Sequence, residues 1–588
     1  MEMKSWKIPI LILLITISLI SVLSVNIEYS ITDLKKFKSY QELKDFLNSR
    51  TYAFRRGWYS LNAETFRAFE DTSGPSAEYS ETNVQVEGVD EADTVKTDGE
   101  CLYVVAGQEV IVAKAYPAEE AAIIARIPVG SVSSQLFLSQ ERLAVLYGKN
   151  DQDNEIRSFV RLYDVSVKES PLLIREVSVE GYYVSSRMIG KYVYVVARKG
   201  AWIVNDQVSL PRINSGDGDE EVAATEIYYE DVSDYGYAFT TVLAVNIQQD
   251  EQNPEHKVIL SGWTTTLYVA EQSIYLASSR TSTTIIHRIQ IENGEICLAA
   301  SGEISGTVPN QFSMDEYNGY FRIVTTSRIT DLNGELFKLD LQNSIYVLDM
   351  NPTVIGKLQG LAKGETVHSA RFMNTLCYLV TFRKVDPFFV IDLSDSWNPK
   401  VLGELKIAGY SDYMHMYDEN HVIGAGKETV AAEQGDVSWY QGLKISLFDV
   451  TNVSDPKEMA RYTIGDRGSD SPVLNDHKAF LFDGEKHLLA IPVLVAEINE
   501  SKYPNGVPQC AMGEAVWQGA YVFTVTLAGQ EIKLMGTITH IENGDVSNYT
   551  RHVKRVLYIG DVLYTISDGI IKMSSLTDLS DISVLSLN

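Results

Sequence analysis

Cysteine is scarce in this sequence. Four cysteines occur in 588 residues, and no two have the CxxC spacing typical of a structural zinc site. The spacing also gives no support to a dense disulfide framework. Cys101, Cys297 and Cys377 lie inside apolar runs, so we expect them to be buried as small hydrophobic residues.

Positive charge is also in short supply. The chain has 50 Lys and Arg against 78 Asp and Glu, a formal net charge of −28. Affinity for nucleic acid comes from clustered cationic side chains, and the sequence has no basic cluster, so we expect no nucleic-acid partner. The acidic excess is typical of a solvated surface, and divalent-cation binding is the alternative interpretation.

The common catalytic motifs are absent. The sequence contains no HExxH zinc motif and no GxSxG nucleophile elbow. The letters VDEAD at 89–93 match a helicase motif, but the chain has no phosphate-binding GxxxxGK[ST] loop, which excludes an ATPase of that class. These absences favour a protein that is not an enzyme. They do not exclude catalysis, because residues from distant parts of a chain can assemble one active site.

Long hydrophobic runs are absent except at the N-terminus. Lys4 and Lys7 precede 18 uncharged residues, Ile8 to Val25, which predicts that the chain is exported. We interpret residues 1–28 as a signal anchor, with a cleaved signal peptide as the alternative. Either interpretation places the acidic bulk of the protein outside the cytoplasm.

A short helix and a linker are predicted next. Apolar residues between Asp33 and Asn48 recur at helical spacing, with Thr32 or Asp33 as the N-cap, so 29–50 is assigned to an amphipathic helix. Its apolar face would lie on the membrane or pack on the main domain. Residues 51–82 end in the Gly, Pro and Ser typical of a linker.

From residue 83 to 588 the chain repeats one pattern of short strands. Apolar strands such as GKYVYVV at Gly190 alternate with strands that end in an acidic turn, such as ISLFDVT at Ile445. Four short strands per unit predict the blades of a single large all-β propeller, each blade antiparallel and buried on both faces. Nine units can be counted, starting near residues 95, 133, 182, 264, 309, 366, 410, 471 and 551. Because smaller rings are commoner, we expect about eight blades, with the C-terminal segment closing the ring against residues 84–127.

The start of this region resembles a known family. Residues 80–105, SETNVQVEGVDEADTVKTDGECLYVV, are similar to the entry segment of secreted or membrane-anchored archaeal and bacterial proteins with a C-terminal β-propeller distantly related to WD repeats. The similarity extends to the order of anchor, short helix, linker and blades. It implies the fold and export only, and no activity.

Three acidic clusters could hold calcium. We interpret Asp90, Glu91 and Asp93 as an acidic turn before the first hairpin turn at Asp98 and Gly99, with a calcium site as the alternative. The clusters at 151–155 (DQDNE) and 214–221 (NSGDGDEE) do not follow the order of an EF-hand loop. We therefore predict no cofactor, with calcium as the alternative.

Long insertions between second and third strands carry most of the candidate binding residues. In an antiparallel blade these loops emerge on the same face as the connections between blades, so we expect them to crowd one face. Their aromatic side chains would stack on sugars or anchor a protein partner, or would only pin each loop to the rim. The candidates are Trp202, Tyr228, Tyr229, Trp439, Tyr440, Tyr503 and Trp517.

Together these patterns favour a monomeric, membrane-anchored, extracytoplasmic propeller that binds an envelope protein or glycan. The first alternative is an extracellular hydrolase or lyase that uses carboxylates or calcium at the channel mouth. The second alternative is a structural component of the envelope.

Overall fold

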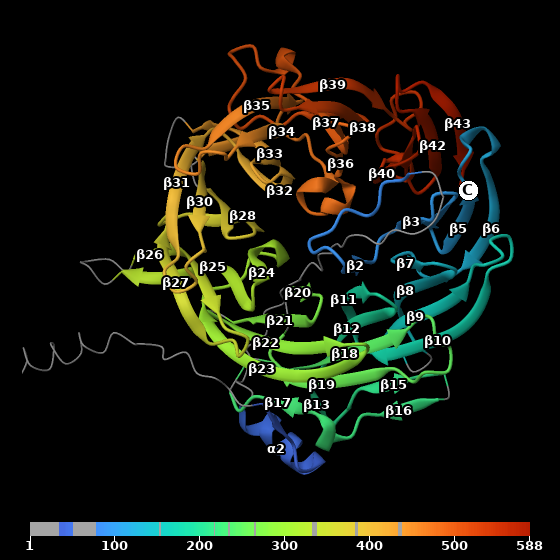
Figure 1. Cartoon of the computed structure of the whole chain (residues 1–588), viewed down its shortest axis with the longest axis vertical. Helices are drawn as coiled ribbons and strands as arrows, with labels where there is room; N and C mark the ends of the chain where they lie inside the picture. The colour runs from blue at the N-terminus through green and yellow to red at the C-terminus, as the bar shows by residue number, and fades with distance from the viewer. Residues whose placement is uncertain are drawn as a thin grey trace, which may run out of the picture.

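Nine four-stranded antiparallel meanders are arranged in a ring around a central channel (Figure 1). In this computed structural model the described residues are 34–50 and 78–587, with gaps at 152–153, 217, 233, 235, 264–265, 281, 332–337, 383–385 and 433–437. The first strand of each meander faces the channel and the fourth lies at the rim. The predicted anchor at residues 1–28 and most of the predicted linker lie outside the described residues.

The first five sheets follow the chain from residue 95. Sheet 1 comprises β3 (Val95–Thr97), β4 (Cys101–Ala106), β5 (Glu109–Lys114) and β6 (Ala122–Pro128). Sheet 2 comprises β7 (Gln135–Ser139), β8 (Arg142–Asn150), β9 (Ile156–Asp164) and β10 (Leu172–Glu180). Sheet 3 comprises β11 (Tyr182–Ile189), β12 (Tyr192–Gly200), β18 (Ala238–Asn246) and β19 (Glu255–Ser261). Sheet 4 comprises β20 (Thr266–Ala270), β21 (Ser273–Ser279), β22 (Thr283–Glu292) and β23 (Glu295–Ser305). Sheet 5 comprises β24 (Met314–Tyr317), β25 (Tyr320–Asp331), β26 (Lys338–Leu348) and β27 (Val354–Leu361).

Four further sheets complete the ring. Sheet 6 comprises β28 (Thr366–Met373), β29 (Leu376–Phe382), β30 (Asp386–Asp392) and β31 (Lys400–Ile407). Sheet 7 comprises β32 (Tyr410–Asp418), β33 (His421–Ala431), β34 (Ser438–Asp449) and β35 (Lys457–Ile464). Sheet 8 comprises β36 (Leu481–Asp483), β37 (Leu488–Glu497), β38 (Glu514–Thr526) and β39 (Glu531–Ile538). Sheet 9 comprises β40 (Arg555–Ile559), β41 (Val562–Ile566), β42 (Ile570–Ser575) and β43 (Asp581–Ser586). Each of the nine units counted in the sequence corresponds to one sheet. The ring therefore has one sheet more than the eight or so that we expected because smaller rings are commoner.

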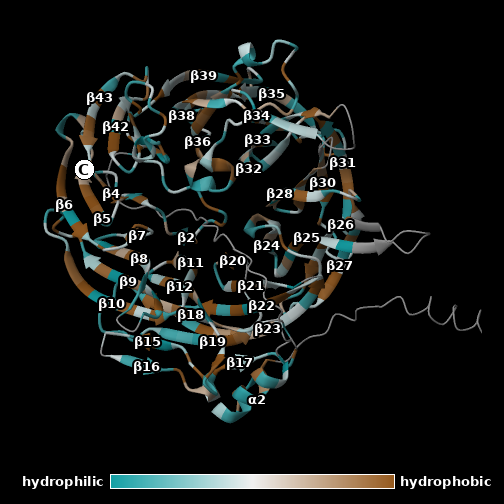
Figure 2. Cartoon of the chain, turned by 180° about the vertical axis from the view of Figure 1, so that it is seen from behind, coloured by the Kyte–Doolittle hydropathy of each residue, from teal (hydrophilic) through white to brown (hydrophobic). Residues whose placement is uncertain are grey.

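The hydrophobic core is divided into clusters between adjacent sheets. Nine such clusters occur among the described residues, and each joins two neighbouring sheets. One of them contains Leu102 and Val104 of the first sheet together with Tyr564 and Ile571 of the last, which confirms the predicted closure. Figure 2 shows the corresponding hydrophobic colour along the strands. Because both faces of every sheet are covered, the central strands read as nearly continuous apolar runs.

The insertion between β12 and β18 does not only cap one face. It forms a separate hairpin of β13 (Ile203–Val204) and β14 (Gln207–Val208). Two of its strands, β15 (Arg212–Asn214) and β16 (Asp219–Glu221), extend sheet 2 beyond β10, and β17 (Tyr228–Tyr229) pairs with β19. Much of the insertion therefore covers the outer rim, as Figure 1 shows, because the outermost strands offer backbone groups that it can pair.

The N-terminal helix is packed on this rim. The helix α2 spans Tyr40–Arg50 and is the single α-helix among the described residues. It starts later than predicted because β1 (Lys35–Lys36) forms a strand with β17, and the Ser39 hydroxyl accepts a hydrogen bond from the backbone N–H of Glu42. Its buried face, with Leu43, Phe46 and Leu47, joins the core between sheets 2 and 3, so the helix packs on the domain. None of the described helices is long and apolar enough to cross a membrane.

The cysteines are all free, and one of them departs from the prediction. Cys101 and Cys377 are buried, whereas Cys297 and Cys510 are exposed. Cys297 lies on β23, the outermost strand of sheet 4, where alternation turns its neighbour Ile296 inward and Cys297 outward.

Short 3₁₀ turns connect several strands. They are η1 (Ala118–Glu120), η2 (Ala224–Glu226), η3 (Gln311–Ser313), η4 (Pro472–Leu474), η5 (His477–Ala479), η6 (Glu500–Lys502) and η7 (Tyr549–Arg551).

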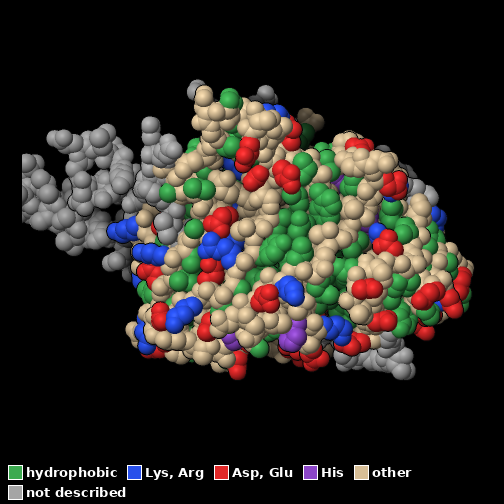
Figure 3. Space-filling view, turned by 90° about the horizontal axis from the view of Figure 1, so that it is seen from above, with side chains coloured by type: hydrophobic (Ala, Val, Ile, Leu, Met, Phe, Trp, Pro, Cys, Tyr) green, Lys and Arg blue, Asp and Glu red, His purple; other side chains and the backbone are tan. Residues whose placement is uncertain are grey.

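On the face in Figure 3, acidic, basic and hydrophobic side chains are interspersed, so the acidic excess is not gathered there in one patch.

His540, just after β39, gives the fold a pH dependence. The two ring nitrogens lie 3.0 Å from the Ser567 hydroxyl and 2.9 Å from the Thr565 hydroxyl. Burial lowers the pKa of His540 to about 4 from an ordinary value of 6.5. The neutral ring therefore contributes stability that is present above pH 6.5 and is lost as the pH falls towards 4.

We expect the wild type to lose about 3 kcal/mol more unfolding free energy than His540→Gln between pH 7 and pH 4, because the glutamine does not titrate. Urea midpoints measured for both proteins across this range test the prediction. Parallel stability curves for the two proteins would contradict it.

Candidate functional site

The segment from Tyr79 to Asp93 crosses the channel inside the ring. It enters at sheet 9, where Tyr79 bridges Ile559, and leaves at sheet 2, where Asp93 exchanges two backbone hydrogen bonds with Leu136. Between these points β2 (Asp90–Glu91) pairs with β11, the inner strand of sheet 3. Figure 1 shows this blue segment in the middle of the ring. The segment therefore lies at the closure between sheets 9 and 1 and extends from there across the channel.

Two amide side chains bind the segment to other sheets. The Asn83 side chain donates to the Phe480 carbonyl at 2.7 Å, just before β36 of sheet 8. The Gln85 side chain donates to the carbonyls of Gln311 and Met314, both at 3.0 Å, at the start of sheet 5. The segment is therefore held by backbone and side-chain contacts to sheets distributed around the ring.

The carboxylates of the VDEAD motif lie against cations of the protein. Asp93 accepts two hydrogen bonds from the Arg555 Nε, at 3.0 and 3.1 Å, and Arg555 also donates to Asp476 at 2.5 Å. Glu91 is fully buried, 3.5 Å from the guanidinium of Arg187. The acidic turn is thus an ion-pairing centre inside the channel. The sequence left calcium as an alternative partner for these carboxylates. In the structure, arginine side chains of the protein lie next to them.

Burial and pairing compete in setting the pKa values in the channel. Burial disfavours a charged Arg555, but the carboxylates of Asp476 and Asp93 outweigh it, so the pKa of Arg555 is raised. Burial lowers the pKa of Lys478, opposed by Asp476, whose carboxylate lies 3.7 Å from the amine. Burial raises the pKa of Asp90, opposed by Lys96 at 2.6 Å. The carboxylates therefore outweigh burial at Arg555, whereas at Lys478 and Asp90 burial has the larger effect on the pKa.

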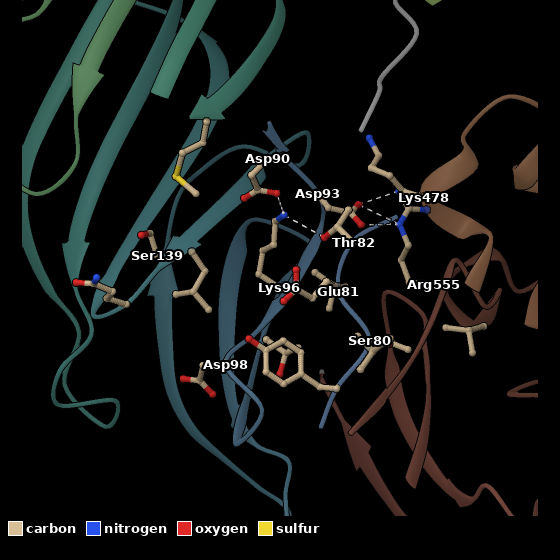
Figure 4. Close-up of a pocket in the computed structure, with 18 of the residues that line it drawn as sticks. Ser80, Glu81, Thr82, Asp90, Asp93, Lys96, Asp98, Ser139, Lys478 and Arg555 are labelled. Carbon is tan, nitrogen blue, oxygen red and sulfur yellow. Dashed lines mark hydrogen bonds and ion pairs between the residues drawn. The ribbon is translucent and has the colours of Figure 1, made fainter. Parts of the chain in front are cut away.

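A cavity of about 670 Å³ opens beside this centre (Figure 4). Its walls come from the entry segment, from the inner strands of sheets 1, 2, 3 and 9, and from η5. Figure 4 shows Asp90 and Lys96 on one side and Asp93 with Arg555 on the other, with the hydroxyls of Ser80, Thr82 and Ser139 nearby. The wall residues are Tyr79, Ser80, Glu81, Thr82, Gly88, Asp90, Asp93, Val95, Lys96, Thr97, Asp98, Leu138, Ser139, Gln140, Met188, Gly190, Lys478, Arg555, Val556 and Leu557. We call this space the entry cavity.

The aromatic residues predicted to bind do not line the entry cavity. Trp202 is 54% exposed and lies 6.2 Å from Trp263, beside sheet 3. Tyr229 is buried and stacks on Phe37 at 4.0 Å, which fixes the N-terminal segment to the rim. Its neighbour Tyr228 lies under the amine of Lys36. Tyr228 and Tyr229 thus both contact the N-terminal segment at the rim.

The other predicted aromatics belong to sheets 7 and 8. Trp439 and Tyr440 both contact the guanidinium of Arg467, at 4.7 and 4.4 Å. Trp517 is partly buried and packs edge-on against Tyr521 at 5.3 Å. Tyr503 follows η6 in the insertion between β37 and β38 and is partly exposed. The predicted set is therefore dispersed around the molecule, and whether any of it binds a ligand stays a prediction.

The remaining acidic clusters are also paired with cations. Asp151 and Asp219 both bind Arg157, at 2.9 and 2.7 Å, and Glu221 lies 3.8 Å from Arg212. Among the described residues there is no group of three or more His, Cys, Asp or Glu side chains placed to hold a metal ion.

Sequence reasoning missed the cationic half of the centre. Arg555, at the start of the apolar strand RVLYI, was the available signal, because a charge at the head of a buried strand needs a partner. Asp476 and Lys478 lie in a connection with no motif, so their role depends on a three-dimensional arrangement that spacing does not encode.

Comparison with known proteins agrees with this architecture. The family model described as a β-propeller domain matches residues 79–579. The chain belongs to this β-propeller domain family. The match begins at Tyr79, so the family's domain includes the segment that crosses the channel.

Two archaeal relatives of this β-propeller protein extend over most of its length. An uncharacterized protein of Methanocaldococcus jannaschii is 28% identical, over 84% of this chain and 82% of its own. An uncharacterized protein of Archaeoglobus fulgidus is 27% identical, over 79% of this chain and 86% of its own. A crystal structure of the eukaryotic initiation factor aligns with 62% of this chain and 87% of its own at 10% identity, with a TM-score of 0.27.

Loss of Arg555 should destabilise the ring. Arg555→Met leaves the buried Asp93 and the half-buried Asp476 without their main partner, so we expect a loss of about 3 to 5 kcal/mol in unfolding free energy. The control Lys502→Ala removes an exposed pair with Glu514 and should cost less than about 1 kcal/mol. Denaturant midpoints of the two variants measure the difference, and equal losses would refute the assignment.

Proposed function

We propose that this propeller is an extracytoplasmic binding module that holds a glycan of the cell envelope in the entry cavity. The observation that carries the proposal is the cavity itself. Its volume of about 670 Å³ lies in the range of small-molecule sites, and hydroxyl, amide and carboxylate groups from three segments converge on it: the entry segment, β3 with its turn, and β7 with its turn.

The charge balance of the cavity favours a neutral, polyhydroxylated ligand. Asp93 is compensated by Arg555, and Asp90 by Lys96, so the strongest charges of the wall are already paired. The Thr82 hydroxyl accepts from Lys96 and the Ser80 hydroxyl accepts from the Tyr558 backbone N–H. Ser139 and Gln140 offer a hydroxyl and an amide to sugar hydroxyls. An envelope protein would need a broad surface, and the dispersed aromatic residues supply no single one.

The proposed location depends on the N-terminal sequence. Lys4 and Lys7 followed by the uncharged run to Val25 support export and attachment to the cell membrane. A ring closed by its own first and last sheets supports a monomer, because the ends of the chain already complete each other. No cofactor is part of this proposal.

Blocking the entry cavity should abolish glycan binding. Ser139 lies on the wall at the end of β7, so Ser139→Trp fills the space without touching the ion pairs. We expect the wild type to bind members of an immobilised oligosaccharide array and this variant to lose at least tenfold in affinity.

The matched control is Ser133→Trp, an exposed position outside the cavity, which should bind as the wild type does. A triple replacement of Trp202, Trp439 and Trp517 by Ala should also leave array binding intact. Loss of binding in the triple variant with retention in Ser139→Trp would move the site to the insertions and refute the proposal.

A further inference from the structure

A second cavity, of about 230 Å³, lies across the channel from the entry cavity. It is formed by sheets 5 to 8, at the beginning of their inner strands, whereas the entry cavity is formed by sheets 9, 1, 2 and 3. Its polar and aromatic wall residues are Asn310, Phe312, His368, Asp412, Tyr413, Asn475 and His477. We call it the dyad cavity, after the pair described next.

Two β-bulges direct His368 and Asp412 towards each other. In sheet 6 the pairing of β28 with β29 skips His368 between Val367 and Ser369. In sheet 7 the pairing of β32 with β33 skips Asp412 between Ser411 and Tyr413. A bulged residue is freed from the regular alternation of the strand, and bulges are common next to active sites because they re-aim a side chain. The same irregularity at the head of two adjacent inner strands brings these two residues together.

The pair has the geometry of an oriented general base. His368 Nδ1 lies 3.2 Å from Asp412 Oδ1, and the ring is packed against Phe382 and Tyr410 at centroid distances of 5.4 and 4.5 Å. The carboxylate accepts the Nδ1 proton, which leaves the lone pair of Nε2 to accept another. Within the described chain Nε2 makes no hydrogen bond, and about a quarter of each side chain is exposed. The imidazole is therefore held in place by the carboxylate and the two aromatic rings, and it is reachable from the cavity.

The residues that line the dyad cavity limit the classes of substrate that it could bind. Among the described residues that line the dyad cavity there is no Lys or Arg, which disfavours phosphate and sulfate esters. Asp412 is its one carboxylate, so it lacks the pair that glycoside hydrolysis uses. The amides of Asn310 and Asn475 are donors for a carbonyl oxygen, and Phe312 supplies an apolar wall. A cavity of about 230 Å³ holds a small acyl group only.

We propose that the dyad cavity is a hydrolytic site for neutral carboxylic esters with a small acyl group, in which His368 is the general base. His368 Nε2 takes a proton from water as the water oxygen bonds to the ester carbonyl carbon, and the carbonyl electron pair moves to oxygen. Collapse of this adduct breaks the bond to the alcohol oxygen, which receives the proton from Nε2. The products are one carboxylic acid and one alcohol. Asp412 is a positioning residue that keeps the proton on Nδ1 and stabilises the imidazolium.

The test is hydrolysis of p-nitrophenyl acetate by the full chain. We expect turnover by the wild type, a loss of about 100-fold or more in kcat for His368→Ala, and partial recovery when imidazole is added to His368→Gly. Asp412→Asn should lower kcat with little change in KM, because the amide favours the wrong tautomer without closing the cavity.

The matched control is another His and Asp pair. His421 Nδ1 lies 2.8 Å from Asp418 in the β32 to β33 hairpin, outside both cavities, so His421→Ala should retain full activity. Ser139→Trp should also retain it, which separates this site from the proposed glycan site. Absence of turnover by the folded wild type, or equal activity of His368→Ala and wild type, would overturn the proposal. If His368→Ala does not fold, His368→Gln replaces it with the same expectations.

Discussion

The ion pair between Asp93 and Arg555 is the contact on which the rest of the structure depends. It joins residues 462 positions apart, one in the segment that enters the ring and one at the head of the last inner strand. A buried pair of this kind adds little net stability over a well-packed apolar pair, but an unpaired member is costly. The pair therefore disfavours arrangements of the last sheet that would leave either charge buried without a partner.

Apolar packing supplies the complementary constraint. Each sheet buries both faces against its neighbours, so no sheet has a complete core of its own. The outer edges are treated differently from the faces. The long insertion after β12 forms strands that pair with β10 and β19, and α2 packs against the insertion. The insertion therefore covers the outer edges of sheets 2 and 3.

Much of the fold follows from local pattern, whereas the sites do not. Strands such as Tyr192–Gly200 can be predicted because a strand buried on both faces needs an apolar run. The hairpin turn at Asp98 and Gly99 can be predicted from the residue types that such turns require. The sequence shows that Asp93 is acidic, but it does not predict the pairing with Arg555. The spacing of residues along the chain does not indicate which distant strands become neighbours in the ring. His368 and Asp412 were invisible for the same reason, and because a β-bulge breaks the alternation that makes a strand predictable. The burial of Tyr229 against Phe37 could not be predicted either, because the sequence does not show which segment an aromatic in a long insertion meets.

The segment that crosses the channel also decides how the molecule can meet its surroundings. Propellers with an open axis can admit a strand of polymer from one end and let it out at the other. Here Tyr79 to Asp93 spans that axis and is hydrogen-bonded to sheets on several sides of the ring. A polymer that threaded the axis would have to displace this segment and break the contacts that hold it.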